Sequence, residues 1–290
     1  AGLEDPRGLF VIFDADSTVT PNFFAEVRRV FEGGVQAAQS FVAPIIPEAS
    51  LRVFEKQSQS ETEIASQRTL AMTVPTLAAY SEILSQVFDD DVRSRLGWSV
   101  PLRGTGMAFR VELLRELLPH VHTRTEDIEL SLLLAQRGVR VKFLRDAVVY
   151  DPKPRDAARV SRQRARWLQG QMQVWRSYWK MILHLLLRGA EMGWLLSALL
   201  LKPKTFFIVL KFVVCVVSLF LPIHFLIKLL FAFPFIAEIF YYGFGLMFVP
   251  SQDRSRYASA LLRAPLYVVV WAQSLITAMR ERDRWLSVRH

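Results

Sequence analysis

Two carboxylates, Asp14 and Asp16, follow directly after the short apolar run of residues 9–13, and Ser17 and Thr18 come next. Acids at the end of a buried strand are typical of proteins that bind or transfer phosphate groups, and the pattern is compatible with two such functions. Asp14 could attack a phosphoryl group while Asp16 acts as acid and base. Alternatively, Asp16 could hold a divalent ion against the diphosphate of a nucleotide, with Asp14 beside it. A solvated turn that caps a helix would contain the same residue types, so the local pattern leaves all three open.

The first form would be that of a haloacid-dehalogenase-like phosphatase with Asp14 as its nucleophile. Such enzymes also use a downstream lysine and a later acidic pair at a strand end. The acidic run Asp89–Asp91 lies instead in a polar stretch that we expect to be helical, and no lysine stands in a suitable position. The phosphatase therefore remains an alternative that the rest of the chain supports weakly.

A second acidic group, Thr125-Glu126-Asp127, stands at the predicted start of a helix. Acids are favoured there by the helix dipole alone, whatever their function. The same position keeps a carboxylate ionised at low pH and able to accept a proton. It could therefore take the proton of a sugar hydroxyl as that hydroxyl attacks.

The basic and aromatic stretch of residues 155–176 contains Gln163, Arg166 and Trp167. Residues three and four apart share one face of a helix, so Gln163 and Trp167 point the same way, with Arg166 beside them. An amphipathic helix at a membrane surface would account for the arginines. Functionally, Arg166 could clamp a diphosphate and Trp167 could offer a flat apolar face to a sugar ring.

The elements that must position these groups form an alternation of strands and helices. We predict the strands and helices from apolar periodicity and from caps and stops, with Thr20 as N-cap of the first helix and Gly138 as stop of the last. A tight turn is expected at Gly104-Thr105-Gly106. Strands separated by helices imply an α/β layer, and the first strand reads as a parallel one. The predicted strands are residues 9–13, 35–42 and 139–150, and the predicted helices are residues 21–32, 51–95 and 126–136.

The C-terminal part of the chain is more apolar than a soluble protein requires. The 290 residues are 52% hydrophobic, with a mean hydropathy of +0.23 and a net charge of +9. Residues 206–249 are long enough for two membrane crossings at about 20 residues each, and residues 179–201 suit a helix in the membrane surface. Residues 267–279 suit either a third, short span or a surface helix, and the flanking charges favour the surface helix. Arginines flank this part, which favours cytoplasmic flanks and anionic lipid over nucleic acid as the partner. The single cysteine, Cys215, allows no disulfide within the chain.

Taken in order, Asp14-Ala15-Asp16, Thr125-Glu126-Asp127 and Gln163-Arg164-Ala165-Arg166-Trp167 resemble the motifs of membrane-embedded family 2 glycosyltransferases. These include cellulose, chitin and hyaluronan synthases and bacterial exopolysaccharide synthases. The resemblance implies an α/β fold: a partial, Rossmann-like GT-A domain, followed by interfacial and transmembrane α-helices. It assigns residues 1–155 to the catalytic domain, 156–203 to the Gln-x-x-Arg-Trp element and interfacial helices, and 204–290 to transmembrane helices and a basic tail. Because the family has a further nucleotide-binding half upstream, we expect the chain to be N-terminally truncated.

The same resemblance implies a role for each motif. Asp16 and Asp14 would bind Mg²⁺ or Mn²⁺ and the nucleotide diphosphate, and Asp127 would be the catalytic base, supported by Glu126. The turn at Gly104, Thr105 and Gly106 would lie near the acceptor sugar. Diphosphate and acceptor would be bound by Gln163, Arg166 and Trp167.

The reaction implied is an inverting transfer from a nucleotide sugar to a growing saccharide or lipid-linked acceptor. The enzyme would be a multi-pass protein of the cell membrane with a cytoplasmic catalytic domain, and polysaccharide-export proteins would be possible partners. A non-catalytic membrane scaffold of a glycan-assembly complex is the alternative from another class.

Overall fold

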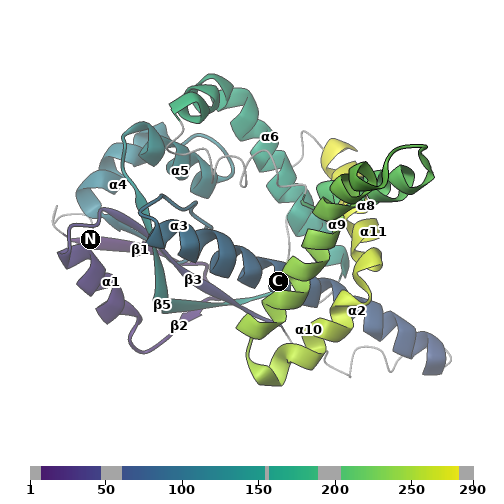
Figure 1. Ribbon diagram of the computed structural model, residues 1–290. Coiled ribbons are helices and arrows are strands. Elements are labelled where there is room, and N and C mark those ends of the chain that lie inside the picture. Colours follow the sequence, from purple (N-terminus) through teal and green to yellow (C-terminus); the bar gives the residue numbers. More distant parts are fainter. Residues whose placement is uncertain (1–7, 47–60, 154–156, 189–203, 281–290) are drawn as a thin grey trace.

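The computed structural model describes residues 8–46, 61–153, 157–188 and 204–280, and its centre is a mixed five-stranded sheet (Figure 1). The strand order is β1-β4-β3-β5-β2. The pair β3–β5 is parallel, and the pairs β1–β4, β3–β4 and β2–β5 are antiparallel. The strands are β1 (Leu9–Ile12), β2 (Thr18–Val19), β3 (Ala37–Ile45), β4 (Met107–Arg110) and β5 (Val141–Pro152).

The prediction that the first strand is parallel is wrong. β1 lies at the edge of the sheet and pairs with β4, with Leu9 opposite Arg110 and Ile12 opposite Met107. β4 enters the sheet from the turn at Gly104–Gly106 and runs back toward the start of β1, which makes the pair antiparallel. Because β1 pairs on one side only, its residues are half-buried rather than fully buried.

Helices cover both faces of the sheet. On one face α1 (Phe23–Glu32) buries Phe23, Val27 and Phe31 against small strand residues, among them Ala38 and Ala108. On the other face α4 (Val111–Leu117) and α5 (Glu126–Gln136) pack against Met107, Phe109, Val141 and Phe143. A short 3₁₀ turn, Leu118–His120, follows α4. The mixed α/β class predicted from the sequence is therefore confirmed.

The helix predicted at residues 126–136 has the bounds of α5, and Gly138 ends it at φ +71°. The first helix begins later than predicted. Its N-cap is Asn22 rather than Thr20, since the Thr20 carbonyl accepts the amide of Phe23 and so forms a turn ahead of the helix.

The long helical stretch predicted before residue 95 is present in three joined parts. They are α2 (Glu61–Leu84), a π-helical turn at Ser85–Asp90 and α3 (Asp91–Arg95); residues 47–60 lie outside the described chain. The π turn contains Gln86, whose side chain accepts the amide of Val42 and donates to its carbonyl, each at 2.7 Å. An extra residue in a helix turn often marks such a local demand, and here it ties the helix to β3.

The longest helix is α6 (Ala157–Arg188), which packs on α5. Its buried residues Val174, Ile182 and Leu185 meet Ile128 and Leu132 of α5 in one apolar cluster. The predicted surface helix at residues 179–201 is therefore, up to residue 188, the C-terminal part of α6; residues 189–203 lie outside the described chain.

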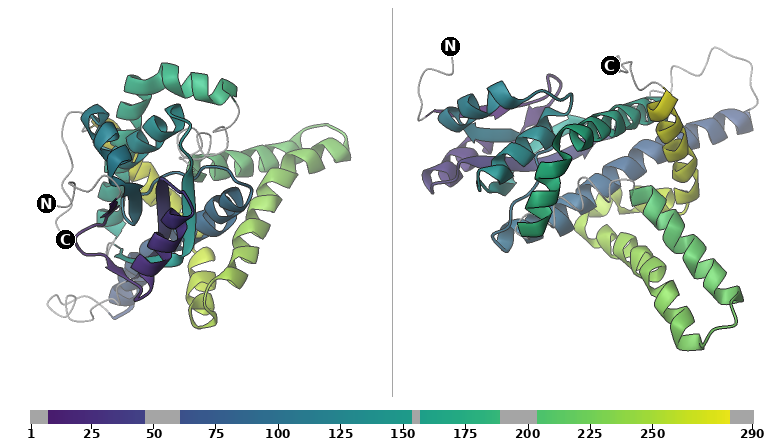
Figure 2. Two further views of the ribbon diagram at one scale, coloured as in Figure 1. Left: turned by 90° about the vertical axis from the view of Figure 1, so that its left-hand side faces the viewer. Right: turned by 90° about the horizontal axis from the view of Figure 1, so that it is seen from above.

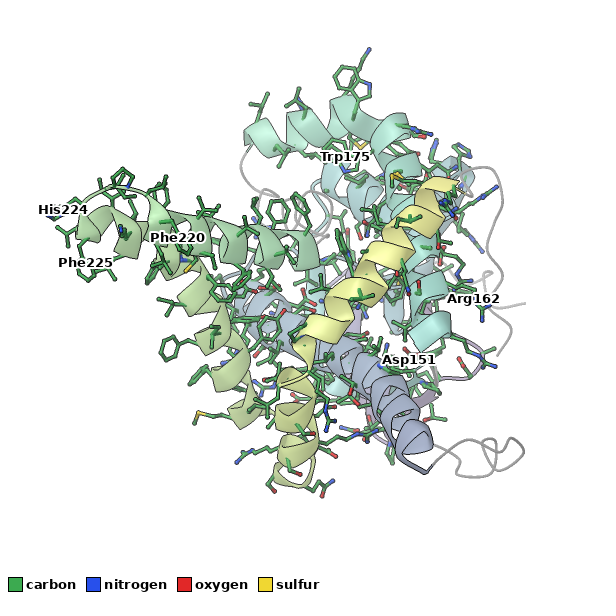
Figure 3. All side chains as sticks on the ribbon, turned by 90° about the vertical axis from the view of Figure 1, so that its right-hand side faces the viewer. Asp151, Arg162, Trp175, Phe220, His224 and Phe225 are labelled. Carbon is green, nitrogen blue, oxygen red and sulfur yellow. The ribbon has the colours of Figure 1, made fainter. Side chains whose placement is uncertain are left out.

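Two apolar helices, α8 (Lys204–Phe220) and α9 (Phe225–Gly245), form a hairpin that projects from the rest of the molecule (Figure 2). Phe220, His224 and Phe225 lie at its tip (Figure 3). Among the described residues, one segment, Phe225–Phe248, is long and apolar enough to cross a membrane by length and composition. Of the two predicted spans, only the one in α9 meets this criterion within the described residues, where α8 has 17 residues.

The chain returns from the hairpin to the body of the molecule through short helices. Ser251–Asp253 and α10 (Arg254–Leu261) follow the 3₁₀ turn Leu246–Phe248, and α11 (Ala264–Arg280) then packs beside α6 and α2. Trp271 is 9% exposed, and the hydroxyls of Ser274 and Ser161 are 3.1 Å apart. The apolar segment at residues 267–279 is therefore partly covered by protein.

Candidate functional site

The acidic turn and the glycine turn are joined by one threonine. Asp14 and Asp16 are exposed where the chain leaves β1. The amide of Asp14 donates to Thr105 Oγ1 at 3.2 Å, and Ser17 Oγ lies 3.2 Å from the same oxygen. Thr105 itself is 3% exposed, so these contacts hold the acidic turn against residues 104–106 although the two are about 90 residues apart in sequence.

The glycine turn is held from behind by side chains that sequence reasoning did not identify. Gln39 of β3 accepts the amide of Arg103 at 2.8 Å and donates to the Thr105 carbonyl at 2.9 Å. The Arg103 guanidinium forms an ion pair with Asp90, whose side chain is 2% exposed. Within the acidic run Asp89–Asp91, Asp90 therefore has a structural role as the partner of Arg103.

Both glycines of the turn have positive φ, +88° at Gly104 and +66° at Gly106. A side chain at Gly106 would lie 2.7 Å from Val149 Cγ2 and 3.1 Å from Ser40 Cβ, so the close approach of β3 and β5 requires glycine. At Gly104 the surroundings are open, and an added Cβ would meet Asp127 Oδ2 at 3.9 Å. The turn therefore lies beside the carboxylate of Asp127.

Asp127 and Glu126 form the first turn of α5. Asp127 is half-buried, and its Oδ1 accepts the amide of Ile128 at 2.8 Å. Glu126 is exposed by surface area, yet desolvation by surrounding protein atoms, with the neighbouring charge of Asp127, raises the pKa of its carboxyl. The low pKa that a helix N-terminus favours is therefore not found for Glu126.

The third motif approaches the same place from α6. Gly170 lies so close to Thr125 that an added Cβ would be 2.1 Å from Thr125 Cγ2. Trp167 stands one helical turn before Gly170 on the same side of α6, and its side chain is 45% exposed. Gln163 and Arg166 are half-buried on the preceding turns. Asp14 thus contacts Thr105, Gly104 lies near the Asp127 carboxylate, and α6 approaches Thr125 at Gly170.

Another group missed at the sequence level is a buried lysine at the end of β5. Lys153 Nζ is 2.6 Å from both Asp151 Oδ2 and Glu82 Oε2. Burial raises the pKa of Asp151, Lys153 opposes that rise, and the charges of Glu82 and Asp14 add to it. The Asp-Pro-Lys sequence after an alternating strand was the available signal for this cluster beside the acidic turn.

The donor set fits a divalent ion of the kind that binds together with substrate phosphates. Among the described residues, no group of three or more His, Cys, Asp and Glu side chains could hold a metal ion. Mg²⁺ commonly takes one or two carboxylates and completes its coordination with water and phosphate oxygens. Two exposed acids, Asp14 and Asp16, match that requirement, whereas a site built wholly from protein ligands is not found in this part of the chain.

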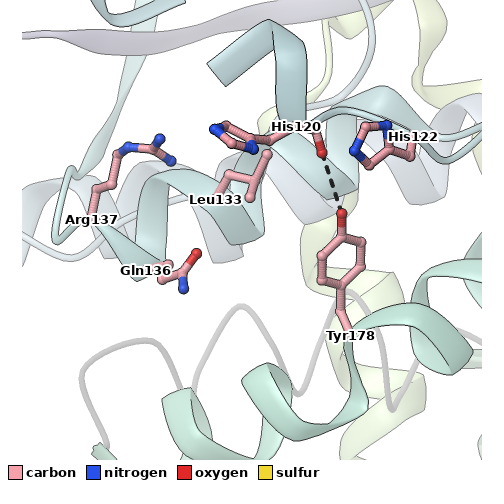
Figure 4. A pocket seen from close by; sticks show the side chains of 6 residues that line it. All are labelled: His120, His122, Leu133, Gln136, Arg137 and Tyr178. Atoms are coloured by element: carbon pink, nitrogen blue, oxygen red, sulfur yellow. Dashed lines mark hydrogen bonds between the residues drawn. The ribbon is translucent and has the colours of Figure 1, made fainter. Parts of the chain in front are cut away.

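A pocket of about 410 Å³ lies elsewhere, between the last turn of α5 and α6 (Figure 4). Leu133, Gln136 and Arg137 line it from α5, and Tyr178 lines it from α6, together with His120 and His122. Arg137 is ten residues from Asp127, and an α-helix rises about 1.5 Å per residue. The pocket therefore lies toward the C-terminal end of α5, whereas Asp127 lies at its start.

A sheet covered by helices on both faces, with acidic loops at its edge, defines a mixed α/β domain consistent with the GT-A type. Residues 9–249 match the model of the family described as glycosyl transferase family group 2. The chain belongs to this family, and it is a glycosyltransferase in the general sense of catalysing sugar transfer. A search of the curated proteins gives no match.

Proposed function

We propose that the protein transfers a sugar, with inversion at the anomeric carbon, from a nucleotide sugar to a growing polysaccharide or glycolipid. The observation that carries this proposal is the meeting of two acidic turns at one glycine turn: Thr105 binds the amide of Asp14, while Gly104 lies beside Asp127. A diphosphate held at the first turn would leave its sugar near the carboxylate of the second. The synthase type named by the resemblance remains part of this proposal.

In this scheme Asp127 accepts the proton of the attacking hydroxyl, and Glu126 supports it. A single base without an enzyme nucleophile agrees with one in-line displacement and therefore with inversion. Asp16 and Asp14 would hold Mg²⁺ or Mn²⁺, which would offset the charge that develops on the departing diphosphate. Arg166 and Gln163 would contact that diphosphate. Trp167, with almost half of its surface exposed, would stack on the acceptor end, next to the turn at Gly104–Gly106.

The test of this assignment is the Asp127→Asn variant in membranes that contain the full-length protein. Wild-type membranes should incorporate label from one of radiolabelled UDP-glucose, UDP-N-acetylglucosamine or GDP-mannose, and EDTA should abolish the incorporation. Asn keeps the shape of Asp but cannot accept the proton, so we expect transfer to fall by at least about 100-fold.

A matched control is Asp146→Asn, the same chemical change at an exposed position of β5. It should retain wild-type transfer. Unchanged transfer in Asp127→Asn would refute the role of this carboxylate. Turnover absent from the wild type, together with glycan assembly that survives Asp127→Asn but not removal of the protein, would favour the scaffold alternative.

The phosphatase alternative gains no support from the surroundings of Asp14. Lys153, which follows β5, is already bound by Glu82 and Asp151, and the family is one of sugar transferases. Trapping of a phosphate analogue such as fluoroberyllate at Asp14 would nevertheless decide for the phosphatase.

We also propose that the hairpin of α8 and α9 inserts into the cell membrane from its cytoplasmic face. Its large apolar side chains face outward: Phe220, Phe240 and Leu230 are 83%, 72% and 68% exposed, and only 6% of the apolar window in Phe225–Phe248 is buried by protein. Exposed apolar surface of this extent requires a partner. Arg254, Arg256 and Arg263 follow the hairpin in sequence, as the positive-inside rule demands of a cytoplasmic flank.

A further inference from the structure

A buried carboxylate that the proposed chemistry does not use lies two residues beyond Asp127. The side chain of Glu129 is 0% exposed and accepts hydrogen bonds from two separate parts of the chain. From the segment before α5 it accepts the amide of His122 at 2.9 Å and the amide and hydroxyl of Thr123 at 2.6 and 2.7 Å. From α6 it accepts the hydroxyl of Tyr178.

Burying the ionised carboxylate of Glu129 without hydrogen-bond partners would cost folding free energy. An ionised carboxylate removed from water must be compensated by hydrogen bonds or by a cation. No ion pair to Glu129 is present in the part of the chain that the structure describes, and the compensation comes from the donors of residues 122, 123 and 178. Removing any of them leaves a buried charge partly unsatisfied. The carboxylate therefore ties the segment 120–125 to α6 more strongly than an apolar contact would.

The α6 side of this contact is one continuous helix face. Gly170, Val174 and Tyr178 follow one another at intervals of four residues and so lie in a row. Gly170 lies against Thr125, Val174 is 0% exposed, and the Tyr178 hydroxyl also lies 3.4 Å from the His120 carbonyl, as Figure 4 shows. Beside this row, Gln173 accepts the amide of Arg124 at 3.2 Å. Trp167 lies one helical turn before Gly170 on the same helix.

From these contacts we propose that Glu129 is a positioning residue, which clamps the segment 120–125 and α6 together and thereby sets the spacing between Asp127 and Trp167. The inference rests on the proposed function, because it needs Asp127 as base and Trp167 as the acceptor platform. Glu129 would contact neither substrate, but it would influence whether the acceptor hydroxyl or water attacks the sugar.

The chemistry supplies a direct measure of that spacing. In transfer, the bond from the anomeric carbon to the diphosphate oxygen breaks, a bond to the acceptor oxygen forms, and Asp127 receives the hydroxyl proton. Water can replace the acceptor in the same step and gives the free sugar instead. A displaced Trp167 would bind the acceptor sugar less well and so slow transfer, whereas attack by water does not need Trp167. The ratio of hydrolysis to transfer therefore reports position, whereas a loss of folded enzyme lowers both products by the same factor.

The experiment compares Glu129→Gln, Tyr178→Phe and the double variant in membranes, with the same three labelled nucleotide sugars. Free sugar and polymer-bound or lipid-bound sugar are counted separately. We expect transfer to fall by about 10- to 100-fold, the range that a misplacement of about 1 Å produces, with a smaller loss of hydrolysis. The double variant should lose no more than Glu129→Gln alone, because both changes break one contact.

Two controls match the chemical changes. Glu116→Gln removes an exposed carboxylate from α4, and Ser177→Ala removes an exposed hydroxyl next to Tyr178; both should keep the wild-type ratio. If Glu129→Gln lowers transfer and hydrolysis equally, the residue only stabilises the fold and the inference is overturned. If the wild type transfers sugar from none of the donors, the proposed function fails and the inference falls with it.

Discussion

At the scale of single residues, Thr105 is the side chain on which the candidate site depends most. One hydroxyl serves two partners of the acidic turn, the amide of Asp14 and the hydroxyl of Ser17. The backbone carbonyl of the same residue is held by Gln39. Thr105 therefore fixes the acidic turn relative to the sheet, because its hydroxyl contacts the turn and its carbonyl accepts from Gln39 of β3.

Replacing Thr105 by Val should distinguish the effect of the hydrogen bond from the effect of side-chain volume. Val has nearly the same volume but no oxygen, so the Asp14 amide loses its acceptor, at a cost of about 0.5–1.5 kcal/mol. We expect a lower melting temperature and a higher KM for the nucleotide sugar. Thr105→Ser keeps the hydroxyl and should stay close to the wild type in both measurements. A valine variant with the wild-type KM would show that this hydrogen bond does not position the acidic turn.

At the scale of elements, α5 shows what can be predicted locally. Its bounds follow from apolar periodicity, from the acids at its start and from Gly138 at its end, all of which act within a few residues. The order of the three motifs along the chain likewise indicated a family 2 glycosyltransferase, and the comparison confirmed the family at that level. The antiparallel pairing of β1, the Arg103–Asp90 pair and the Lys153 cluster were not predicted. Each depends on partners distant in sequence, and a carboxylate that will be buried looks the same in the sequence as a solvated one.

The start of α5 should also depend on pH through Glu129. Burial raises the pKa of Glu129, but the hydrogen bonds from Tyr178, His122 and Thr123 outweigh it and leave the pKa below the ordinary value of 4.5. The same contact and burial raise the pKa of Tyr178 to about 12, so the phenol stays a donor. Since the folded pKa is the lower one, the contribution of Glu129 to stability is complete above pH 4.5 and is lost as the pH falls through the folded value.

The difference in melting temperature between the wild type and Glu129→Gln measures that contribution in detergent solution. It should be constant from pH 7 to about pH 5 and should shrink as the pH falls further, since the wild-type carboxyl then becomes neutral as well. The Glu116→Gln variant serves as reference, because its carboxylate is exposed. A difference that stays constant down to pH 3 would contradict the lowered pKa.

At the scale of the whole molecule, two parts of the chain differ in how they cover their apolar residues. The α/β part buries its apolar residues in cores on both faces of the sheet, whereas the hairpin exposes apolar residues along its length. α2 connects the two, since Tyr80 and Leu84 pack with Val249 and Tyr257 beyond the end of α9. If the hairpin inserts as proposed, this contact would hold the site at a fixed height above the bilayer.

The single cysteine gives a direct test of insertion. Cys215 lies within α8 and is half-buried by protein. In intact membranes we expect no reaction of Cys215 with a membrane-impermeant maleimide, and full reaction after denaturation in SDS. On a Cys215→Ser background, Ser251→Cys places the thiol at an exposed position just beyond α9, and it should react once the cytoplasmic face is opened. Rapid labelling of Cys215 in intact membranes would place the hairpin outside the lipid.

The hairpin contains one pair of opposite charges, with Lys211 of α8 2.5 Å from Glu238 of α9. A lone ammonium at the middle of a bilayer costs about 3 kcal/mol on the insertion scale, and α8 by itself would enter with one. If the hairpin inserts as proposed, Glu238 would neutralise that charge before it meets hydrocarbon, and α8 and α9 would be expected to enter the lipid together as one unit.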